Sequence, residues 1–409
     1  MKTREAFHIR NVRREQENTD AGAFARLAAR ITAGDESGSC RETELWFRVR
    51  EPYGRYLTDS QADAFAVSLL YTAACTGRDI LSDVPVSGRL LYQLNEYMLP
   101  SLAGMLGKEP VRVRAPAARE PLPCEGAVGT GYSGGVDSFF TISQHTGMAL
   151  QDAPWRPALT HILVINAGVY EGPDARVVFE NACRDAEEAG AALGLKAVGI
   201  DTNLHPALKE CYLSVSSFRL CAAVLSMQGL FGTYLLSSGN THEYFRLAQK
   251  DIASVDLLTC GMLSTETLRF TGFGGGTPRI EKIRALTEYA PCYTRLHPCF
   301  VNPVTEMNCG HCKKCRRDTV SLWAMGALDR FSAVYDVKRA ERERTVSIAF
   351  LLANSGVGFY REALDEMERA GIAVPARSRI LAEQFRRSMS YLEKKDESDE
   401  TDSDQAPGS

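Results

Sequence analysis

The feature that most constrains this chain is a glycine-containing hexapeptide, Ser-Gly-Gly-Val-Asp-Ser, at residues 133–138. It follows a short apolar segment typical of a buried strand and precedes a segment typical of a helix. Two adjacent glycines let the backbone adopt unusual dihedral angles and approach a ligand closely. Successive backbone N–H groups at a helix N-terminus bind anions, and the helix dipole reinforces this. The context predicts a phosphate-binding loop; the alternative is a glycine turn that only caps a buried helix.

The sequence contains no GxxxxGK[ST] motif, which excludes the common NTPase P-loop. The hexapeptide matches SGGxDS and resembles the PP-loop of the ATP pyrophosphatase superfamily over about residues 126–317. This resemblance implies a HUP-like fold and cleavage of ATP between its α and β phosphates. It implies that pyrophosphate is held by the loop residues Ser133, Gly134, Gly135, Val136, Asp137 and Ser138. Asp137 and Ser138 are then the catalytic candidates, and Asp137 helps to position Mg²⁺.

Downstream of residue 126, strand-like and helix-like segments alternate. Strands are predicted at residues 126–132, 161–167, 196–201 and 233–238, and helices at 174–193 and 215–230. Such alternation predicts an α/β fold with a doubly wound parallel sheet, whose ligands lie beyond the carboxyl ends of the strands. Polar or glycine residues occupy those ends: Asn166, Gly168, Asp201, Asn203 and residues 238–242. Among them we expect Asn166, Gly239 and Asn240 to contact the nucleotide, with His242 as a further candidate.

A second motif is the C-x2-C-x2-C run of Cys309, Cys312 and Cys315, with Cys299 upstream as a fourth ligand. Four thiolates make a closed tetrahedral zinc site with no open position for catalysis. The combination with SGGxDS resembles the 7-cyano-7-deazaguanine synthases, in which a cysteine precedes a CGxCxxC cluster. An iron–sulfur cluster and unmetallated thiols are the alternatives. His297 and His311 are rival ligands, and a histidine between two ligating cysteines is expected to point outward.

Composition divides the chain further. A proline-rich segment at 116–125 predicts a boundary, so we expect an α+β N-terminal domain over 1–118 and a PP-loop domain with the metal site over 126–317. A helical C-terminal region is expected over 318–390. Residues 391–409 are acidic, and from residue 396 onward they lack aromatic and branched apolar side chains, which predicts a disordered tail over 391–409. Within the N-terminal domain we expect one strand at 44–49, a helix from Asp59 or Ser60 to Gly77, and a second helix from Ser87 that Pro100 bends or ends.

Two further segments are less determined by their sequence. Residues 272–276 hold four glycines, which predicts either a solvated hairpin tip or a mobile lid. Arg279 and Lys282 open the next helix and either face the phosphates or lie on an exposed face.

The net charge of −4 is not the basic balance of a dedicated nucleic-acid binder. The N-terminal residues lack the apolar stretch of a secretory signal, and no apolar run reaches the ~20 residues of a membrane helix. We therefore expect a cytoplasmic protein without a membrane partner. Its twelve cysteines are then expected to be buried thiols, metal ligands or reactive groups rather than disulfides.

These observations and the resemblance together predict a ligase-like enzyme that uses ATP, Mg²⁺ and Zn²⁺. A carboxylate or amide oxygen of a small-molecule or peptide substrate is adenylated, pyrophosphate leaves, and a nitrogen nucleophile attacks. The alternatives are a sulfur transferase acting on tRNA and a non-catalytic ATP-binding sensor or scaffold. The deazaguanine enzymes are shorter and lack comparable terminal regions, so the resemblance implies no substrate.

Asp137 lies at a predicted helix start, where losing its charge is expected to cost only ~0.3–1 kcal/mol of stability.

Overall fold

The computed structural model describes residues 5–19, 22–34, 40–170, 172–247 and 252–387. Contacts divide the chain into two compact units: residues 1–133 with 141–276, and residues 134–140 with 277–409. Helix α5 (Val136–Gln144) begins in the second unit and ends in the first. Among the described residues, no helix has the length and apolar character that a membrane span requires.

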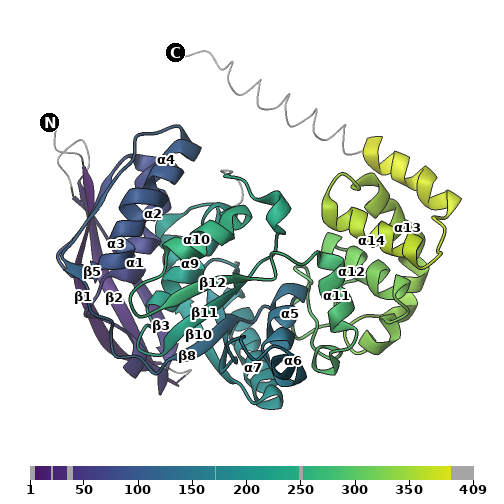
Figure 1. The fold of residues 1–409 in the computed structure, drawn as a ribbon, viewed down its shortest axis with the longest axis horizontal. Helices are drawn as coiled ribbons and strands as arrows, with labels where there is room; N and C mark the ends of the chain where they lie inside the picture. The colour runs from purple at the N-terminus through teal and green to yellow at the C-terminus, as the bar shows by residue number, and fades with distance from the viewer. Residues whose placement is uncertain (1–4, 20–21, 35–39, 171, 248–251, 388–409) are drawn as a thin grey trace, which may run out of the picture. The chain divides into compact units, whose positions relative to one another are not determined.

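The first unit is built on one sheet, to which the described residues contribute ten strands (Figure 1). Their order is β12 (Arg269–Phe273), β11 (Phe231–Ser237), β8 (Ala127–Gly131), β9 (His161–Asn166), β10 (Lys196–Thr202), β3 (Cys40–Arg50), β2 (Gly22–Gly34), β1 (Ala6–Thr19), β4 (Asp79–Ser82) and β6 (Val113–Arg114). Neighbouring strands are parallel except for the antiparallel pairs β10–β3, β3–β2 and β2–β1. The expectation of an α/β fold with a mostly parallel central sheet is confirmed.

The parallel part of the sheet is wound in two directions from β8. The chain proceeds from β8 to β9 and β10 on one side, and then returns to place β11 and β12 on the other. Gly199 of β10 faces Cys183 of α7 (Ala175–Leu193), which covers β9 and β10. Because side chains alternate along a strand, the buried neighbours Val198 and Ile200 point to the opposite face. Strand β10 is therefore covered on both of its faces. The winding direction of the sheet switches beside β8.

The region expected to form a separate N-terminal domain is instead part of this sheet. Strand β3 pairs with β10, with Val49 opposite Ile200 and Phe47 opposite Thr202. Without β3, the edge of β10 would leave backbone N–H and C=O groups unpaired. The boundary expected at 116–125 therefore does not separate two compact units, and β7 (Ala117–Ala118) within it pairs with β5 (Val86–Ser87).

The prediction of a single strand before residue 55 was wrong, because β1, β2 and β3 are all long. One face of this ribbon is apolar and buried, with Ile9, Leu27 and Phe47 almost inaccessible. On the ribbon's polar face Arg26 forms ion pairs with Glu15 and Glu44 on the neighbouring strands. The many arginine and glutamate residues obscure the alternation of polar and apolar side chains that would have predicted these strands from the sequence. Cross-strand pairing supplies the stability that the polar composition obscures.

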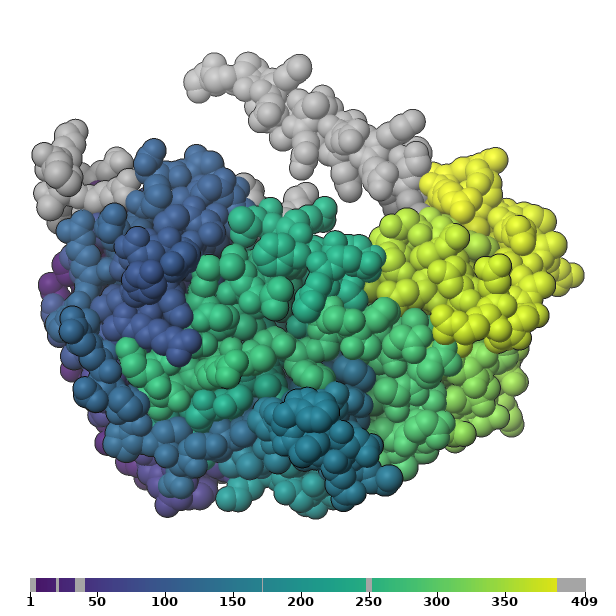
Figure 2. All heavy atoms as spheres, in the orientation of Figure 1, coloured from purple at the N-terminus to yellow at the C-terminus, as the bar shows by residue number. Residues whose placement is uncertain are grey.

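The N-terminal helices pack against the parallel part of the fold. The expected helix to Gly77 is two helices, α1 (Asp63–Ser68) and α2 (Leu70–Thr76), and Gly77 ends it with φ of 69°. Ser87 caps α3 (Gly88–Gln93) as expected, through Leu90 N–H. Pro100 does not end the helical run: it lies in the first turn of α4 (Leu99–Leu106), after a π-helical turn at Leu94–Met98. Helices α1 and α2 contact α9 (Tyr212–Leu225), and the π-helical turn contacts α10 (Asp256–Met262). Figure 2 shows the blue segments of this region against green segments of the first unit.

The glycine-rich segment at 272–276 is ordered where it begins. Gly272 lies inside β12 and pairs with Leu236 of β11, so this residue is part of the sheet rather than of a hairpin tip or lid. The first unit also contains α6 (Gly147–Asp152) and α8 (Leu204–Leu208).

The described part of the second unit is largely helical. Its helices are α11 (Arg279–Leu286), α12 (Lys313–Ala324), α13 (Val337–Ala353) and α14 (Gly358–Arg369), and residues 376–387 are also helical. Helix α12 packs on α13 and α14 around Val320, Ile348 and Met367. The helical C-terminal region is thus observed, but its compact unit begins at residue 277 rather than 318. The tail predicted at 391–409 lies outside the described residues.

Candidate phosphate-binding loop and metal centre

The glycine loop is held in place from two sides within the second unit. Gly134 has φ of 71°, a left-handed conformation that glycine adopts without strain. Its carbonyl accepts a 2.7 Å hydrogen bond from the N–H of His297, and a Cβ at residue 134 would lie 3.4 Å from His297 Cβ. On the other side, Ser138 Oγ and Phe139 N–H both donate to the Gly135 carbonyl, at 3.0 and 3.1 Å. The Ser138 hydroxyl, expected to donate to phosphate, is therefore used here to close the first turn of α5.

Asp137 carries the main electrostatic feature of the loop. Its Oδ2 accepts from Arg279 Nη2 at 2.7 Å, and its Oδ1 accepts from Lys282 Nζ at 2.8 Å. Burial alone would raise the pKa of Asp137, but the charges of Arg279 and Lys282 outweigh it and keep that pKa below its usual value. Both basic residues thus face the loop, although Lys282 is only 2% exposed. Losing the Asp137 charge should therefore cost more stability than the ~0.3–1 kcal/mol expected from its place at a helix start, because the buried Lys282 would be left without its counter-charge.

Further cations surround this pair. Arg317 is buried, forms a 2.7 Å ion pair with Asp318, and acts electrostatically on Asp137. Lys314 lies close enough to Arg279 and Arg317 for charge repulsion. Glu362 also acts electrostatically on Lys282, so these four cations face three carboxylates. Arg279 Nε is also buried and has no hydrogen-bond partner among the described residues. An excess of cations, an unused guanidinium N–H and the start of α5 together suit a polyanion such as a phosphate chain.

The residues predicted at the strand ends lie in the first unit, as does Ser133. Asn166 ends β9 and donates to Asp201 Oδ1 at 2.8 Å. Asn203 accepts from Trp46 N–H and donates to the Glu44 carbonyl, both at 2.8 Å. Asp201 and Asn203 thus fasten β3 to the end of β10, which is a structural role.

The segment after β11 is also tied to its neighbours. Ser238 directly follows β11 and precedes Gly239 and Asn240, and its backbone N–H donates to the Phe273 carbonyl at 2.9 Å. The backbone N–H of His242 donates to the Gly275 carbonyl at 2.8 Å. The structure therefore groups Gly134, Gly135, Asp137 and Ser138 with basic residues in one unit, and Asn166, Gly239 and Asn240 with the sheet in the other.

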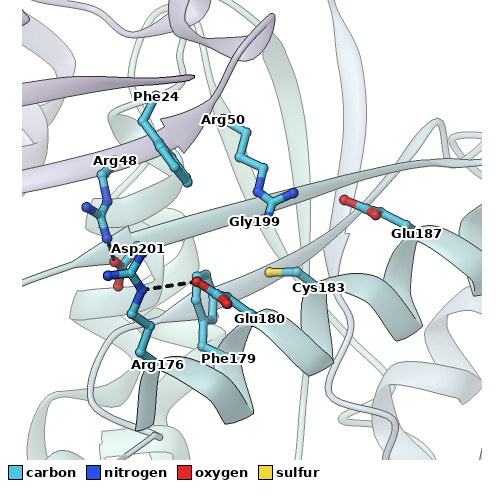
Figure 3. A pocket seen from close by; sticks show the side chains of 10 residues that line it. All are labelled: Phe24, Arg48, Arg50, Arg176, Phe179, Glu180, Cys183, Glu187, Gly199 and Asp201. Carbon is cyan, nitrogen blue, oxygen red and sulfur yellow. Dashed lines mark hydrogen bonds and ion pairs between the residues drawn. The ribbon is translucent and has the colours of Figure 1, made fainter. Parts of the chain in front are cut away.

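A hollow between α7 and strands β2, β3 and β10 contains Asp201 (Figure 3). Arg48 pairs with Asp201 at 2.6 Å, and Arg176 pairs with Glu180 at 3.0 Å. Burial raises the pKa of Cys183, which points into this hollow, to about 12. The thiol is therefore un-ionised at neutral pH, and most of the charges are mutually neutralised.

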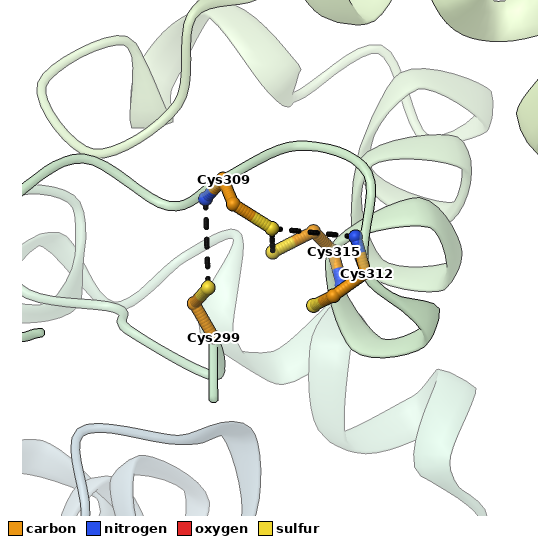
Figure 4. A group of neighbouring side chains, drawn as sticks. All are labelled: Cys299, Cys309, Cys312 and Cys315. Atoms are coloured by element: carbon orange, nitrogen blue, oxygen red, sulfur yellow. Dashed lines mark hydrogen bonds between the residues drawn. The ribbon is translucent and has the colours of Figure 1, made fainter. Parts of the chain in front are cut away.

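The four predicted cysteines converge in the second unit (Figure 4). The sulfurs of Cys299, Cys309, Cys312 and Cys315 all lie within 4.8 Å of one another, and those of Cys309 and Cys315 are 3.9 Å apart. Four sulfurs bound to one zinc ion at ~2.3 Å would be ~3.8 Å apart. The group could therefore hold a metal ion such as zinc, as the sequence predicted.

Backbone N–H groups donate to three of the four sulfurs. Cys309 Sγ accepts from Cys312 N–H at 3.3 Å, and Cys312 Sγ accepts from Cys315 N–H at 3.4 Å. Cys299 Sγ accepts from Val301 and Asn302 N–H at 3.4 and 3.3 Å. A hydrogen bond from the Cys315 thiol, supported by these N–H groups, lowers the pKa of Cys312 to about 4.

The rival histidine ligands do not join the cysteine group. His311 is exposed, and its Nδ1 lies 2.9 Å from the Cys309 carbonyl, so it points away from the sulfurs as expected. The group of ligand atoms in the described chain contains the four cysteines and neither His311 nor His297. Gly310, with φ of 77°, provides the turn between Cys309 and Cys312.

Sequence reasoning missed two residues of these sites. Asp318 lies in α12 next to the cysteine knuckle (residues 299–315), and only its burial and its ion pair with Arg317 mark it as part of the charge cluster. Asn308 lies directly before Cys309 and is almost fully buried, but a single asparagine carries no recognisable signal. Comparisons with protein-family models, with curated proteins and with solved structures gave no match to this chain.

Proposed function

We propose that this protein is an ATP-dependent enzyme of the PP-loop type that forms AMP and pyrophosphate. It adenylates a carboxylate or amide oxygen of a small-molecule or peptide substrate with release of pyrophosphate. A nitrogen nucleophile then attacks the carbon that bears this oxygen, and AMP leaves. The observation that carries this proposal is the SGGVDS loop, which follows β8 at the switch in winding direction and gathers Arg279 and Lys282 on Asp137. Its place after a parallel strand is where such sheets bind ligands.

The loop and its cations have separable tasks in this proposal. ATP with Mg²⁺ supplies an electrophilic α-phosphorus and a pyrophosphate leaving group. Backbone N–H groups at the start of α5 and the side chains of Arg279 and Lys282 hold the departing pyrophosphate, so that its developing charge is neutralised. Asp137 orients both cations. Each of its oxygens accepts from one cation, and the same carboxylate would help to hold Mg²⁺.

We further propose that the cysteine centre holds zinc and is structural. Four sulfur ligands leave no coordination position for a substrate or an activated water. Backbone N–H groups already donate to three of the four sulfurs, and such bonds stabilise the thiolates that zinc requires as ligands.

The sulfur-transfer alternative receives no support from the remaining thiols. Burial raises the pKa of Cys292 to about 12, and it also raises the pKa of Cys221 and Cys260. Thiols that stay protonated at neutral pH are poor nucleophiles and poor carriers of a persulfide. Of the described thiols outside the cysteine centre, Cys124 and Cys211 are exposed.

The test is to identify the nucleotide products. The full chain is incubated with Mg²⁺, ATP and a small-molecule extract from cells, and the products are separated by ion-exchange chromatography. Equal amounts of AMP and pyrophosphate, lost in the Lys282→Met variant, are expected. ADP with phosphate would overturn the proposal, and binding of ATP without any product would favour the sensor alternative.

A further inference from the structure

A buried asparagine lies at the junction between the cysteine centre and the rest of its unit. Asn308 directly precedes Cys309 and is 5% exposed. Its Nδ2 donates to the carbonyls of Leu296 and Val334, both at 2.9 Å, and its Oδ1 accepts from Cys299 N–H at 3.3 Å. Both donor hydrogens and the acceptor of this amide are thus engaged. One side chain therefore joins both halves of the cysteine knuckle to the segment before Cys299.

That segment continues to the phosphate loop. His297 follows Leu296, and its N–H donates to the Gly134 carbonyl at 2.7 Å. The Gly134 backbone also packs against residues 295 and 297. A Cβ added at residue 134 would lie 3.4 Å from His297 Cβ and 3.8 Å from the Arg295 carbonyl oxygen. Residues 295–299 thus contact the loop at one end and the metal ligands at the other.

A second connection runs through α12. Cys312 caps this helix by accepting from Cys315 N–H, and Cys315 lies in its first turn. Arg317 follows two residues later and acts on Asp137. The start of α12 therefore fixes both a metal ligand and one of the charges that the loop experiences.

We propose that Asn308 is a positioning residue that transmits the order of the metal centre to the phosphate loop. With the four cysteines held together, Asn308 keeps residues 295–299 in place, and these fix the Gly134 carbonyl. The inference rests on the proposed function only in what the loop binds. A purely local role for Asn308 makes a different prediction: the knuckle would lose stability, but Gly134–Ser138 would keep its order.

The decisive measurement is hydrogen–deuterium exchange in the full chain. Asn308→Ala is compared with Asn354→Ala, which removes a side-chain amide that donates to a helix carbonyl, Phe350, in the same unit. Peptides covering 132–140 and 295–299 are expected to exchange at least about tenfold faster in Asn308→Ala only, since the three hydrogen bonds of the side chain are lost. Exchange of 132–140 at the wild-type rate, with a lowered melting temperature, would overturn the inference.

Two further measurements keep the test decisive. If Asn308→Ala does not fold, zinc is removed from the wild-type protein with a chelator, and the same peptides are followed against a peptide from α14. Faster exchange at 132–140 but not in α14 supports the inference, and unchanged exchange at 132–140 overturns it. Calorimetry with inorganic pyrophosphate is done in parallel, and an affinity about tenfold weaker is expected in Asn308→Ala. A wild-type protein that binds no pyrophosphate counts against the proposed function, while the exchange data still decide the role of Asn308.

Discussion

At the scale of single residues, the charge state of the loop depends on a pair that lies far apart in the chain. Lys282 is fully buried and its ammonium group contacts Asp137. Burial lowers the pKa of Lys282, and the Asp137 carboxylate opposes this. Each charge therefore makes the other tolerable in a partly desolvated place. Removing one member leaves an uncompensated charge, which costs more than the pair itself contributes.

We expect Asp137→Asn to lower the free energy of unfolding by about 2–3 kcal/mol. The value lies below that of a fully buried pair because Asp137 remains 20% exposed. Urea unfolding measures the change, and pyrophosphate binding should weaken because Arg279 and Lys282 lose their orientation. Glu281→Gln, at an exposed carboxylate on the same helix as both cations, should change neither quantity by much. Equal stability of Asp137→Asn and wild type would show that Lys282 does not depend on this carboxylate.

A second prediction concerns Gly134, whose φ of 71° disfavours any other residue. Gly134→Ala should destabilise the protein by about 1 kcal/mol and weaken pyrophosphate binding, because a Cβ would also press on His297. Thermal unfolding and calorimetry measure the two effects. Gly239→Ala is the matched control, since a Cβ there meets no atom within 4 Å. Reduced ATP affinity in Gly239→Ala instead would show that the nucleotide approaches that backbone.

At the scale of elements, the start of α12 depends on the cysteine centre. Cys312 caps the helix, and Cys315 is buried in its first turn. Helix α12 in turn supports α13 and α14. The order of the whole helical unit should therefore depend on whether the four sulfurs are held together.

We expect about one zinc ion per purified chain and its loss in Cys312→Ala. The variant should also show a lower melting temperature, since a structural zinc site contributes directly to folding. Elemental analysis and thermal unfolding test this. Cys124→Ala removes an exposed thiol and should keep both the metal and the melting temperature. Iron together with labile sulfide in the wild-type protein would replace the zinc assignment with an iron–sulfur centre.

At the scale of the whole molecule, the sequence predicts what is local and misses what is distant. Strand β9 was predicted because its residues are continuously apolar, and the knuckle because its cysteine spacing is specific. The β3–β10 pairing was not predicted, since the residues of neither strand indicate which strand it pairs with. The contacts of Lys282 with Asp137, and of Asn308 with Leu296, were hidden for the same reason. Long-range pairing decides both the extent of the sheet and the charge of the loop.

This pairing makes the N-terminal region indispensable to the first unit. A chain that begins at residue 119 would lose β3 from the edge of β10 and α1 from the surface of α9. Unpaired strand edges and newly exposed apolar surface both favour aggregation. We expect this fragment to be aggregated or to lack a cooperative thermal transition, as judged by size-exclusion chromatography and circular dichroism. A monomeric fragment with the melting temperature of the full chain would restore the independent N-terminal domain.

The packing contact between the N-terminal helices and the rest of the first unit contains a buried carboxyl group that should make the stability depend on pH. Asp63 of α1 is 1% exposed and accepts from Ser87 N–H at 2.8 Å and from Gln228 Nε2 at 2.9 Å. Burial raises the pKa of Asp63 from 3.8 to about 6, against the effect of these hydrogen bonds. The folded state thus favours the protonated acid. Its stabilising contribution is complete below about pH 4 and is lost as the pH rises through 6.

Asp63→Asn should therefore gain stability relative to wild type as the pH rises. A shift of about two pKa units corresponds to about 3 kcal/mol, so the difference in unfolding free energy should change by about 2–3 kcal/mol between pH 4 and pH 7.5. Any constant cost of replacing a carboxyl oxygen by an amide cancels in this comparison. Urea unfolding of both proteins across this range gives the two curves. Parallel curves would mean that Asp63 has the same pKa in the folded and unfolded chains, and that this packing contact tolerates a buried charge without cost.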